Sequence, residues 1–301
     1  MGMFVFKKKL FNKNTLFFGY FLVFCLFTQK ARALRIFVSI SPQAYLVEKI
    51  TGSGIPVHIL MKSSQNPHLY NPTPQQLMLL ANSDIYFSIG LPIEAAFVKK
   101  YQQNFKHVTI VPMNDGIKKR TMTSVHSIRS IKHSHKGLDP HIWLSPVLAK
   151  QLASNIYKAL VDQDPKDKDK YLANLKALHT TLDTVHRENL LQLKPFYGRS
   201  VLVFHPAFGY FLSLYHLKQI AIEIEGKEAS LRYLLNTIAR KSKENNIKTI
   251  FTQPQFAQKS LIAIAQALKV SIQQIDPLEK DLIYNYKKMT RIILENFSQK
   301  N

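Results

Sequence analysis

Four side chains stand beside a proline in settings that suit a metal ion: His68 in NPH, His141 in DPH, His205 in HP and Asp276 in DP. Proline restricts φ locally, so these segments can hold a side chain in a set direction. Three neutral imidazoles and one carboxylate form a ligand set that Zn²⁺ accepts in tetrahedral geometry. Mn²⁺ and Fe²⁺ remain alternatives, although Mn²⁺ prefers more oxygen ligands.

The positions of these residues strengthen the prediction more than their types do. His205 directly follows the apolar run SVLVF, and Asp276 directly follows VSIQQI. Open α/β sheets bind ligands at the carboxyl ends of their strands, where both residues would lie. Taken singly, a histidine beside a proline is more often structural, and an Asp-Pro pair is a common turn former. Four such sites, two in each half of the chain, favour one shared metal site.

The elements that must position these residues alternate between short apolar runs and longer helical patterns. Predicted strands lie at 34–40, 57–60, 85–89, 108–111, 200–204, 249–252 and 270–275. This alternation is typical of parallel sheets covered by helices. We predict an α/β fold of two doubly wound parallel-sheet lobes. The N-terminal lobe is expected at residues 34–160 and the C-terminal lobe at residues 195–301.

One long helix is predicted between the lobes, within residues 161–194. Its apolar positions Tyr171, Leu175, Leu178, Leu182 and Val185 repeat at the spacing of a single helix face. From Pro165 to about Leu193 the segment contains no glycine, and no further proline occurs until Pro195. A helix of this length can cross the whole molecule and so connect the two lobes.

Residues 1–33 have the pattern of a cleavable signal peptide. Four lysines precede the apolar run 16–27, and Ala31-Arg32-Ala33 offers a cleavage site. The single cysteine, Cys25, follows the bulky Phe24, which argues against a lipid anchor. We therefore expect an exported, periplasmic protein without thiolate metal ligands.

The formal net charge of +22 could indicate a nucleic-acid partner. The lysines are spread along the chain, however, with no basic stripe interleaved with aromatic residues, so we expect no nucleic-acid binding. The polar segment 116–137 interrupts the α/β rhythm and carries His126, His133 and His135. It is either a solvated surface loop or an auxiliary loop that collects metal near the site.

The sequence resembles the metal-specific solute-binding proteins of ABC importers, in particular the periplasmic component of high-affinity zinc uptake. The resemblance spans about 34–298 and lies in NPHLYNPTPQQL (66–77), DPHIWLSP (139–146), FHPAFGYFLSLYHL (204–217), EIEGKEASLRYL (223–234), FTQPQF (251–256) and IDPL (275–278). It implies two lobes joined by a single helix, with the metal held in the cleft by His68, His141, His205 and Asp276. Asn66 and Pro206 depart from the family pattern, since an acidic residue is common at both positions.

The function that the resemblance implies is capture of a divalent metal ion, with zinc favoured, and its delivery to the membrane permease of an ABC importer. The protein would be a monomer and not an enzyme. A manganese or iron(II) binder of the same family is the alternative. A zinc hydrolase is a further alternative, but it needs an open coordination position and a general base, and no HExxH helix is present.

Overall fold

The computed structural model describes residues 1–2, 34–63, 65–66, 70–122, 137–222, 237–256 and 258–298. The chain divides into two units, Met1–Ala33 and Leu34–Asn301, and the described helices and strands all belong to the second. Several predicted features lie outside the described residues: almost all of the expected signal peptide, and the histidines His68, His126, His133 and His135.

The first sheet is parallel, as predicted, with the strand order β2-β1-β3-β4. Its strands are β1 (Ile36–Ile40), β2 (Val57–Met61), β3 (Ile85–Ser88) and β4 (Thr109–Pro112). Alternate residues of β1 face opposite sides, since Ile36 and Val38 join one buried cluster and Phe37 joins another. Both faces of this sheet are therefore covered, as the parallel arrangement requires.

Three helices cover the first sheet: α2 (Ser41–Thr51), α3 (Pro74–Ala81) and α4 (Pro92–Lys100). Each has proline in its first turn, where the missing N–H costs nothing. Helix α3 is capped by Thr73, whose Oγ1 accepts a hydrogen bond from Gln76 N at 3.3 Å. Helix α2 begins directly after β1, with Pro42 as its second residue.

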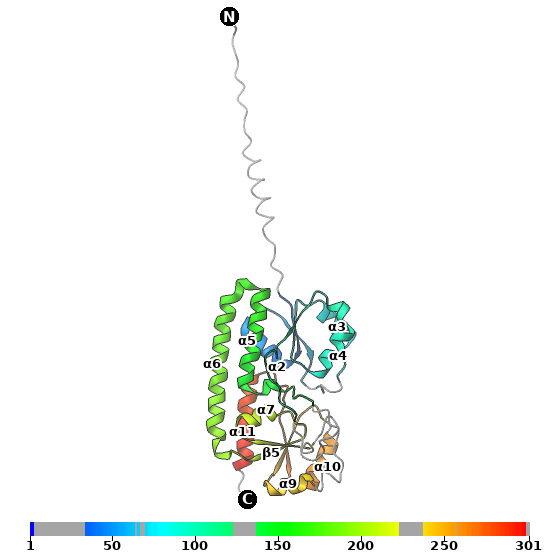
Figure 1. The fold of residues 1–301 in the computed structure, drawn as a ribbon, viewed down its shortest axis with the longest axis vertical. Coiled ribbons are helices and arrows are strands. Elements are labelled where there is room, and N and C mark those ends of the chain that lie inside the picture. The colour runs from blue at the N-terminus through cyan, green and yellow to red at the C-terminus, as the bar shows by residue number, and fades with distance from the viewer. Residues whose placement is uncertain are drawn as a thin grey trace. The chain divides into compact units, whose positions relative to one another are not determined.

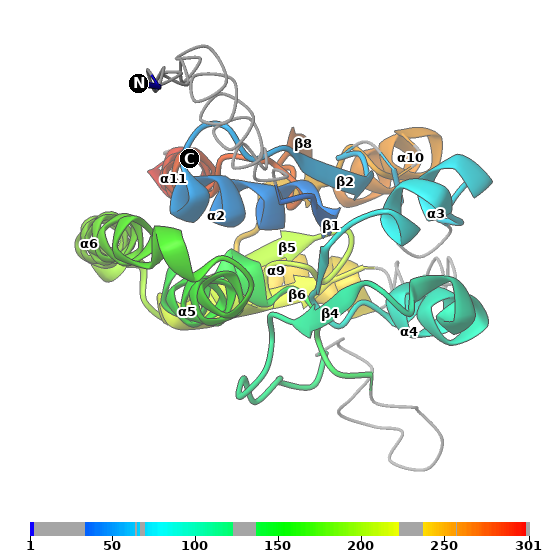
Figure 2. The ribbon, with the colours of Figure 1, turned by 90° about the horizontal axis from the view of Figure 1, so that it is seen from above.

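The predicted long helix is α6 (Lys168–Leu193), preceded by a short 3₁₀ turn at Pro165–Asp167. All five residues of its predicted apolar face are buried. Helix α6 packs on α5 (Pro146–Gln163), on α2 and on α11 (Leu282–Ser298), so it contacts both lobes. Figure 1 shows α6 running alongside both sheets, and Figure 2 shows α5 and α6 side by side.

The second sheet repeats the first, with parallel strands in the order β6-β5-β7-β8. Its strands are β5 (Ser200–Val203), β6 (Lys218–Ala221), β7 (Thr249–Thr252) and β8 (Ser271–Gln274). The described helices of this lobe are α7 (Gly209–Leu214), α9 (Ala239–Glu244), α10 (Gln258–Leu268) and α11. The fold class is thus confirmed, while the exact lobe boundaries at 160 and 195 remain a prediction.

The two lobes share one apolar core. A single buried cluster contains Ile36 and Phe87 from the first sheet, Leu182 from α6, and Val203 and Phe251 from the second sheet. Because interiors of this kind are closely packed, a large relative rotation of the lobes would open voids. The packing therefore favours small movements between the lobes over a wide hinge opening.

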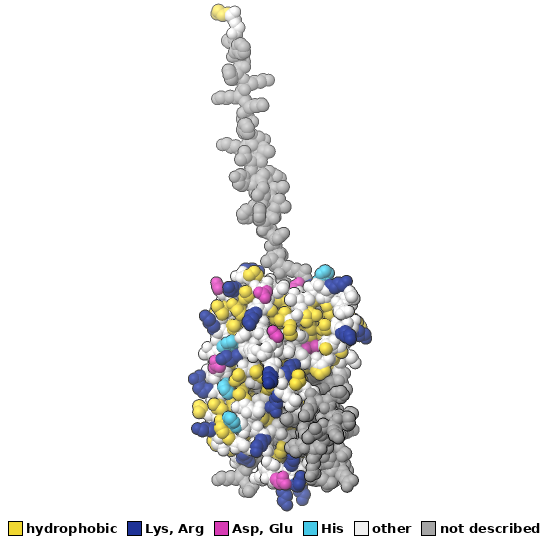
Figure 3. All heavy atoms as spheres, viewed as in Figure 1, with side chains coloured by type: hydrophobic (Ala, Val, Ile, Leu, Met, Phe, Trp, Pro, Cys, Tyr) yellow, Lys and Arg dark blue, Asp and Glu magenta, His cyan; other side chains and the backbone are white. Residues whose placement is uncertain are grey.

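None of the described helices is long and apolar enough to cross a membrane. On the face that Figure 3 shows, Lys and Arg side chains are scattered among apolar and acidic ones. The positive charge of the described surface on this face therefore forms no continuous basic stripe.

Candidate metal centre

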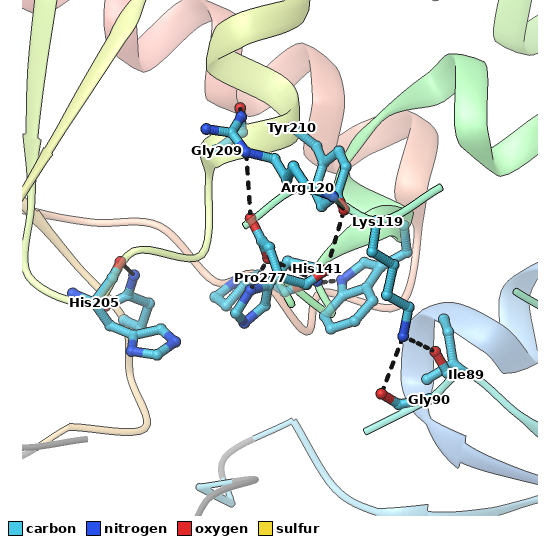
Figure 4. Close-up of polar contacts among 12 residues, drawn as sticks. Ile89, Gly90, Lys119, Arg120, His141, His205, Gly209, Tyr210 and Pro277 are labelled. Carbon is cyan, nitrogen blue, oxygen red and sulfur yellow. Dashed lines mark hydrogen bonds and ion pairs between the residues drawn. The ribbon is translucent and has the colours of Figure 1, made fainter. Parts of the chain in front are cut away.

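The structure brings two of the predicted ligands together from different lobes. His141 follows the polar segment of the first lobe, and His205 follows β5 in the second. Their ring centroids lie 5.3 Å apart, with an interplanar angle of 74°. The two residues are only 7% and 4% exposed, respectively. Figure 4 shows the His141 and His205 side chains near each other.

The imidazole of His141 is oriented by the carboxylate of Asp139. Asp139 Oδ1 lies 2.8 Å from His141 Nδ1 and accepts a further hydrogen bond from the His141 backbone N at 3.0 Å. A carboxylate is an acceptor, so the neutral ring carries its proton on Nδ1. The lone pair of Nε2 is then available to a metal ion, in the arrangement that metal-binding histidines commonly use.

His205 is held mainly through its backbone. The side-chain amide of the buried Gln253 donates to His205 O at 2.9 Å, and its oxygen accepts from His205 N at 3.4 Å. The ring stacks on Phe256, with centroids 5.1 Å apart at 29°. Gln253 follows β7, the neighbour of β5, so both residues lie where the strand order of the second sheet reverses. This is the ligand-binding position of such sheets.

Asp276 lies at the carboxyl end of β8, as predicted, but its Oδ1 is engaged within its own lobe. It accepts hydrogen bonds from Gln255 Nε2 and from the backbone N of Leu278, both at 2.8 Å. Burial raises the pKa of the Asp276 carboxyl, and the bond from Gln255 opposes that rise. Among the described residues, no three His, Cys, Asp or Glu side chains are grouped closely enough to hold a metal.

A cavity of about 300 Å³ opens beside the two imidazoles. Its walls include Tyr70, Trp143, Phe256 and Leu278, together with the amide of Gln255. Cavities lined mostly by apolar groups, with a few directed polar ones, are the usual form of a ligand site. The arrangement can therefore exclude bulk water while presenting two nitrogen donors.

One wall of the cavity, the β3–α4 loop, is fixed by a buried carboxylate. Glu94 accepts hydrogen bonds from the backbone N of Ile89 at 3.1 Å, Gly90 at 2.6 Å and Leu91 at 2.9 Å. Lys119 Nζ donates to the carbonyl oxygen of Gly90 at 3.1 Å (Figure 4). Burial raises the pKa of Glu94 and lowers that of Lys119.

Several residues around the site were not identified from the sequence. Gln253, Gln255 and Arg120 carry no signal by type, because glutamine and arginine are common on surfaces. Only the proline between the two glutamines in TQPQF resembles the features that marked the four predicted ligands. Asp139 belongs to the DPH motif that marked His141, and the structure places its carboxylate directly against the His141 ring.

The chain is similar to known proteins over most of its length. Residues 36–300 match the family model of the zinc-uptake complex component A, periplasmic, called ZnuA. The high-affinity zinc uptake system protein ZnuA of Yersinia pestis is 26% identical over 269 residues, covering 82% of this chain and 84% of that protein. The ZnuA of Bacillus subtilis is 28% identical over 261 residues, covering 83% of this chain and 80% of that protein.

Solved structures show the same fold. A crystal structure of ZnuA superposes with a TM-score of 0.80 at 36% identity, covering 88% of this chain and 100% of that one. A zinc-bound ZnuA deletion mutant superposes with a TM-score of 0.81 at 36% identity, covering 89% of this chain and 100% of that one. The periplasmic zinc-binding protein TroA of Treponema pallidum shares the fold at 18% identity, with a TM-score of 0.76 over 89% of this chain and 100% of that one. The family model covers nearly the whole of the second unit, and this chain belongs to the ZnuA family of periplasmic zinc-uptake components.

Proposed function

We propose that this protein captures a divalent transition metal ion, zinc first, between its two lobes and delivers it to the membrane permease of an ABC importer. The observation that carries the proposal is the pair His141 and His205, which approach each other from different lobes beside a cavity. Membership of the ZnuA family supports zinc as the cargo. The likeness to a zinc-bound ZnuA structure supports it further.

The donor chemistry favours zinc over harder metals. Imidazole nitrogen suits Zn²⁺, whereas Mn²⁺ prefers carboxylate and carbonyl oxygens. The sequence predicts His68 as a third nitrogen donor and Asp276 as an oxygen donor. For Asp276 to bind the metal through Oδ1, the hydrogen bonds from Gln255 and Leu278 must be shared or exchanged. Its Oδ2 is the alternative donor atom.

We further propose that the protein acts in the periplasm as a monomer and catalyses no reaction. The metal is cargo, and a site that binds it by four protein groups leaves no coordination position for a reacting water. The shared core between the lobes favours release through a small tilt that exposes the cavity to the permease. His126, His133 and His135 are proposed to collect metal ions close to the entrance.

The decisive experiment is zinc titration of the mature, metal-free protein in competition with a chromogenic chelator. Wild type is expected to bind one zinc ion. The double variant His141→Ala, His205→Ala should bind zinc far more weakly, because loss of an orienting partner alone lowers metal affinity by roughly 10–100-fold. The matched control is His58→Ala, His107→Ala, which removes two exposed histidines of the first lobe. Equal affinity in wild type and the His141, His205 variant would remove the proposed site.

Two further titrations refine the proposal. Single variants His68→Ala and Asp276→Ala test the remaining predicted ligands, and each is expected to weaken zinc binding. Competition between zinc, manganese and iron(II) at matched free metal concentrations tests the cargo. Preferential retention of manganese or iron(II) would assign the chain to a different metal within the same class of binding protein.

A further inference from the structure

Arg120 connects the first lobe to helix α7 of the second. Its Nη1 donates to the carbonyl oxygen of Gly209 and to Ser213 Oγ, the latter at 3.0 Å. Its backbone N donates to the hydroxyl of Tyr210 at 2.9 Å, and its guanidinium lies 5.7 Å from the centre of the same ring. Figure 4 shows Arg120 reaching Gly209 and Tyr210. One side chain thus binds three residues of the opposite lobe.

The same arginine lies against the carboxylate that orients His141. Arg120 Nε is 3.9 Å from Asp139 Oδ2, and Asp139 is only 1% exposed. That Oδ2 has no hydrogen-bond partner among the described residues, while Oδ1 is bound to His141. A buried carboxylate oxygen without a partner is costly, and a nearby guanidinium reduces that cost. Arg120 therefore helps to keep Asp139 in the position that orients the imidazole.

The backbone around this contact is held both within the first lobe and by a bond from the second lobe. Asp139 N donates to Arg120 O at 2.8 Å, and the Tyr210 hydroxyl donates to Asp139 O at 3.1 Å. A Cβ at Gly209 would lie 3.1 Å from both the Arg120 guanidinium and Asp139 Oδ2. The absence of a side chain at 209 is what lets α7 approach this closely. Asp139, Arg120 and α7 thus form one network directly behind His141.

We propose that Arg120 is a positioning residue for metal capture. Acting through Asp139, it sets the direction of the His141 imidazole. Because Arg120 also contacts α7, that direction depends on the distance between the two lobes. The proposal rests on the function proposed above. It predicts that Asp139 is no longer fixed when the lobes separate at α7. His141 then binds the metal more weakly, which favours release of the metal.

The competing explanation is that Arg120 only stabilises the contact between the two lobes. Loss of Arg120 would then lower stability without changing the metal site. A double-mutant cycle separates the two, because residues that act through one another show non-additive effects. The variants are Arg120→Gln, Arg120→Lys, Asp139→Asn and the double variant Arg120→Gln, Asp139→Asn. Ser213→Ala is a milder variant, which removes one contact to α7 should Arg120→Gln fold poorly.

The matched control is Arg199→Gln. Arg199 also packs its guanidinium on an aromatic ring, 4.1 Å from the centre of Phe297, and donates to Phe297 O at 3.1 Å. It makes these contacts within the second lobe and is not part of the cavity lining. Its loss should lower the unfolding midpoint as the loss of Arg120 does, but leave metal binding unchanged.

Each variant is measured as full-length mature protein for zinc affinity, for the visible absorption spectrum of bound Co²⁺ and for the unfolding midpoint without metal. We expect Arg120→Gln and Asp139→Asn each to weaken zinc binding by about 10–100-fold and to shift the Co²⁺ spectrum. The double variant should be no weaker than the weaker single variant. Arg120→Lys, which keeps the charge but loses the planar fork, should be intermediate.

Two outcomes would overturn the inference. Arg120→Gln and Ser213→Ala could lower the midpoint while zinc affinity and the Co²⁺ spectrum match wild type, or the effects of Arg120→Gln and Asp139→Asn could simply add. Failure of the proposed function looks different, because wild type and Arg199→Gln would then bind neither Zn²⁺ nor Co²⁺.

Discussion

The indole Nε1 of Trp143 donates a hydrogen bond to the carbonyl oxygen of Pro277 at 2.8 Å, across 134 residues of sequence. Trp143 lies two residues after His141, and Pro277 lies one residue after Asp276. The bond is buried and joins the loops that carry predicted ligands from opposite lobes. The hydroxyl of Tyr286 on α11 in turn donates to Trp143 O. Distance between these ligand loops is therefore set by direct contacts and not by the connecting helix alone.

Replacing Trp143 by phenylalanine should destabilise the protein and weaken zinc binding. The change leaves Pro277 O without its buried donor, at an expected cost of about 1–3 kcal/mol in the free energy of unfolding. Urea unfolding followed by circular dichroism measures it, since Trp143 is the only tryptophan and its fluorescence is lost. Tyr197→Phe, at an exposed aromatic position, is the control. An unchanged free energy of unfolding would show that the bond is not maintained in solution.

Gln255 is expected to control how the Asp276 carboxylate is presented to the metal. Its Nε2 donates to Asp276 Oδ1 at 2.8 Å and to Ser63 O in the first lobe. Gln255→Met keeps the length of the side chain and removes both bonds. The Asp276 carboxylate would then lose the donor that fixes its direction, and this loss should outweigh the release of Oδ1, so zinc affinity should fall. Gln255→Glu should weaken binding further, because two carboxylates would then face each other.

Zinc titration checks this order, with Gln266→Met on the exposed face of α10 as the control. Tighter binding by Gln255→Glu would contradict the prediction and would place position 255 among the groups that contact the metal.

Glu94→Leu should be among the most destabilising single substitutions in the first lobe. The carboxylate accepts three backbone N–H groups of the β3–α4 loop, and each buried donor left unpaired costs about 1–3 kcal/mol. Glu94→Gln should cost less, because one amide oxygen remains as an acceptor. Denaturant unfolding of the metal-free variants gives both values. Equal stability of the leucine and glutamine variants would show that these bonds contribute little.

Stability of the metal-free protein should decrease on acidification partly through His179 and His186 of α6. Burial is the main cause that lowers the pKa of both rings below the ordinary value of 6.5. The unfolded chain therefore takes up protons more readily than the folded one. Their contribution is complete above pH 6.5 and is lost as the pH falls below that value, through the lowered pKa of the folded state.

The unfolding midpoint measured between pH 7.5 and pH 5, with a chelator present, should fall less steeply for His179→Gln, His186→Gln than for wild type. His58→Gln, His107→Gln at two exposed positions is the control and should retain the wild-type slope. If the unfolding midpoint of the His179→Gln, His186→Gln variant falls with pH as steeply as that of wild type, other groups cause the loss of stability in acid.

Local patterns predicted most of the described fold, since they depend on short-range physics. The buried face of α6 follows from the spacing of Tyr171 to Val185, and the start of α3 follows from Thr73 and Pro74. Helices α4 and α5 were not predicted, although both begin at proline, because their apolar residues are interleaved with polar ones. Tertiary packing supports their helical state, because Phe97 of α4 packs with Tyr86 of the first sheet and α5 packs on α6 and α2.

The sequence alone determined the residue types available for chemistry, the alternation of strands and helices, and the placement of His205 and Asp276 at strand ends. These depend on side-chain periodicity and on proline, which act within a few residues. Only the tertiary structure decided that His141 meets His205, that Asp139 lies behind His141, and that Gln255 holds Asp276 Oδ1. The contact between His141 and His205 joins segments far apart in the chain, and its geometry follows from how the two lobes pack on a common core. The other two contacts are closer in sequence, but they depend on side-chain directions that residue type and periodicity do not specify.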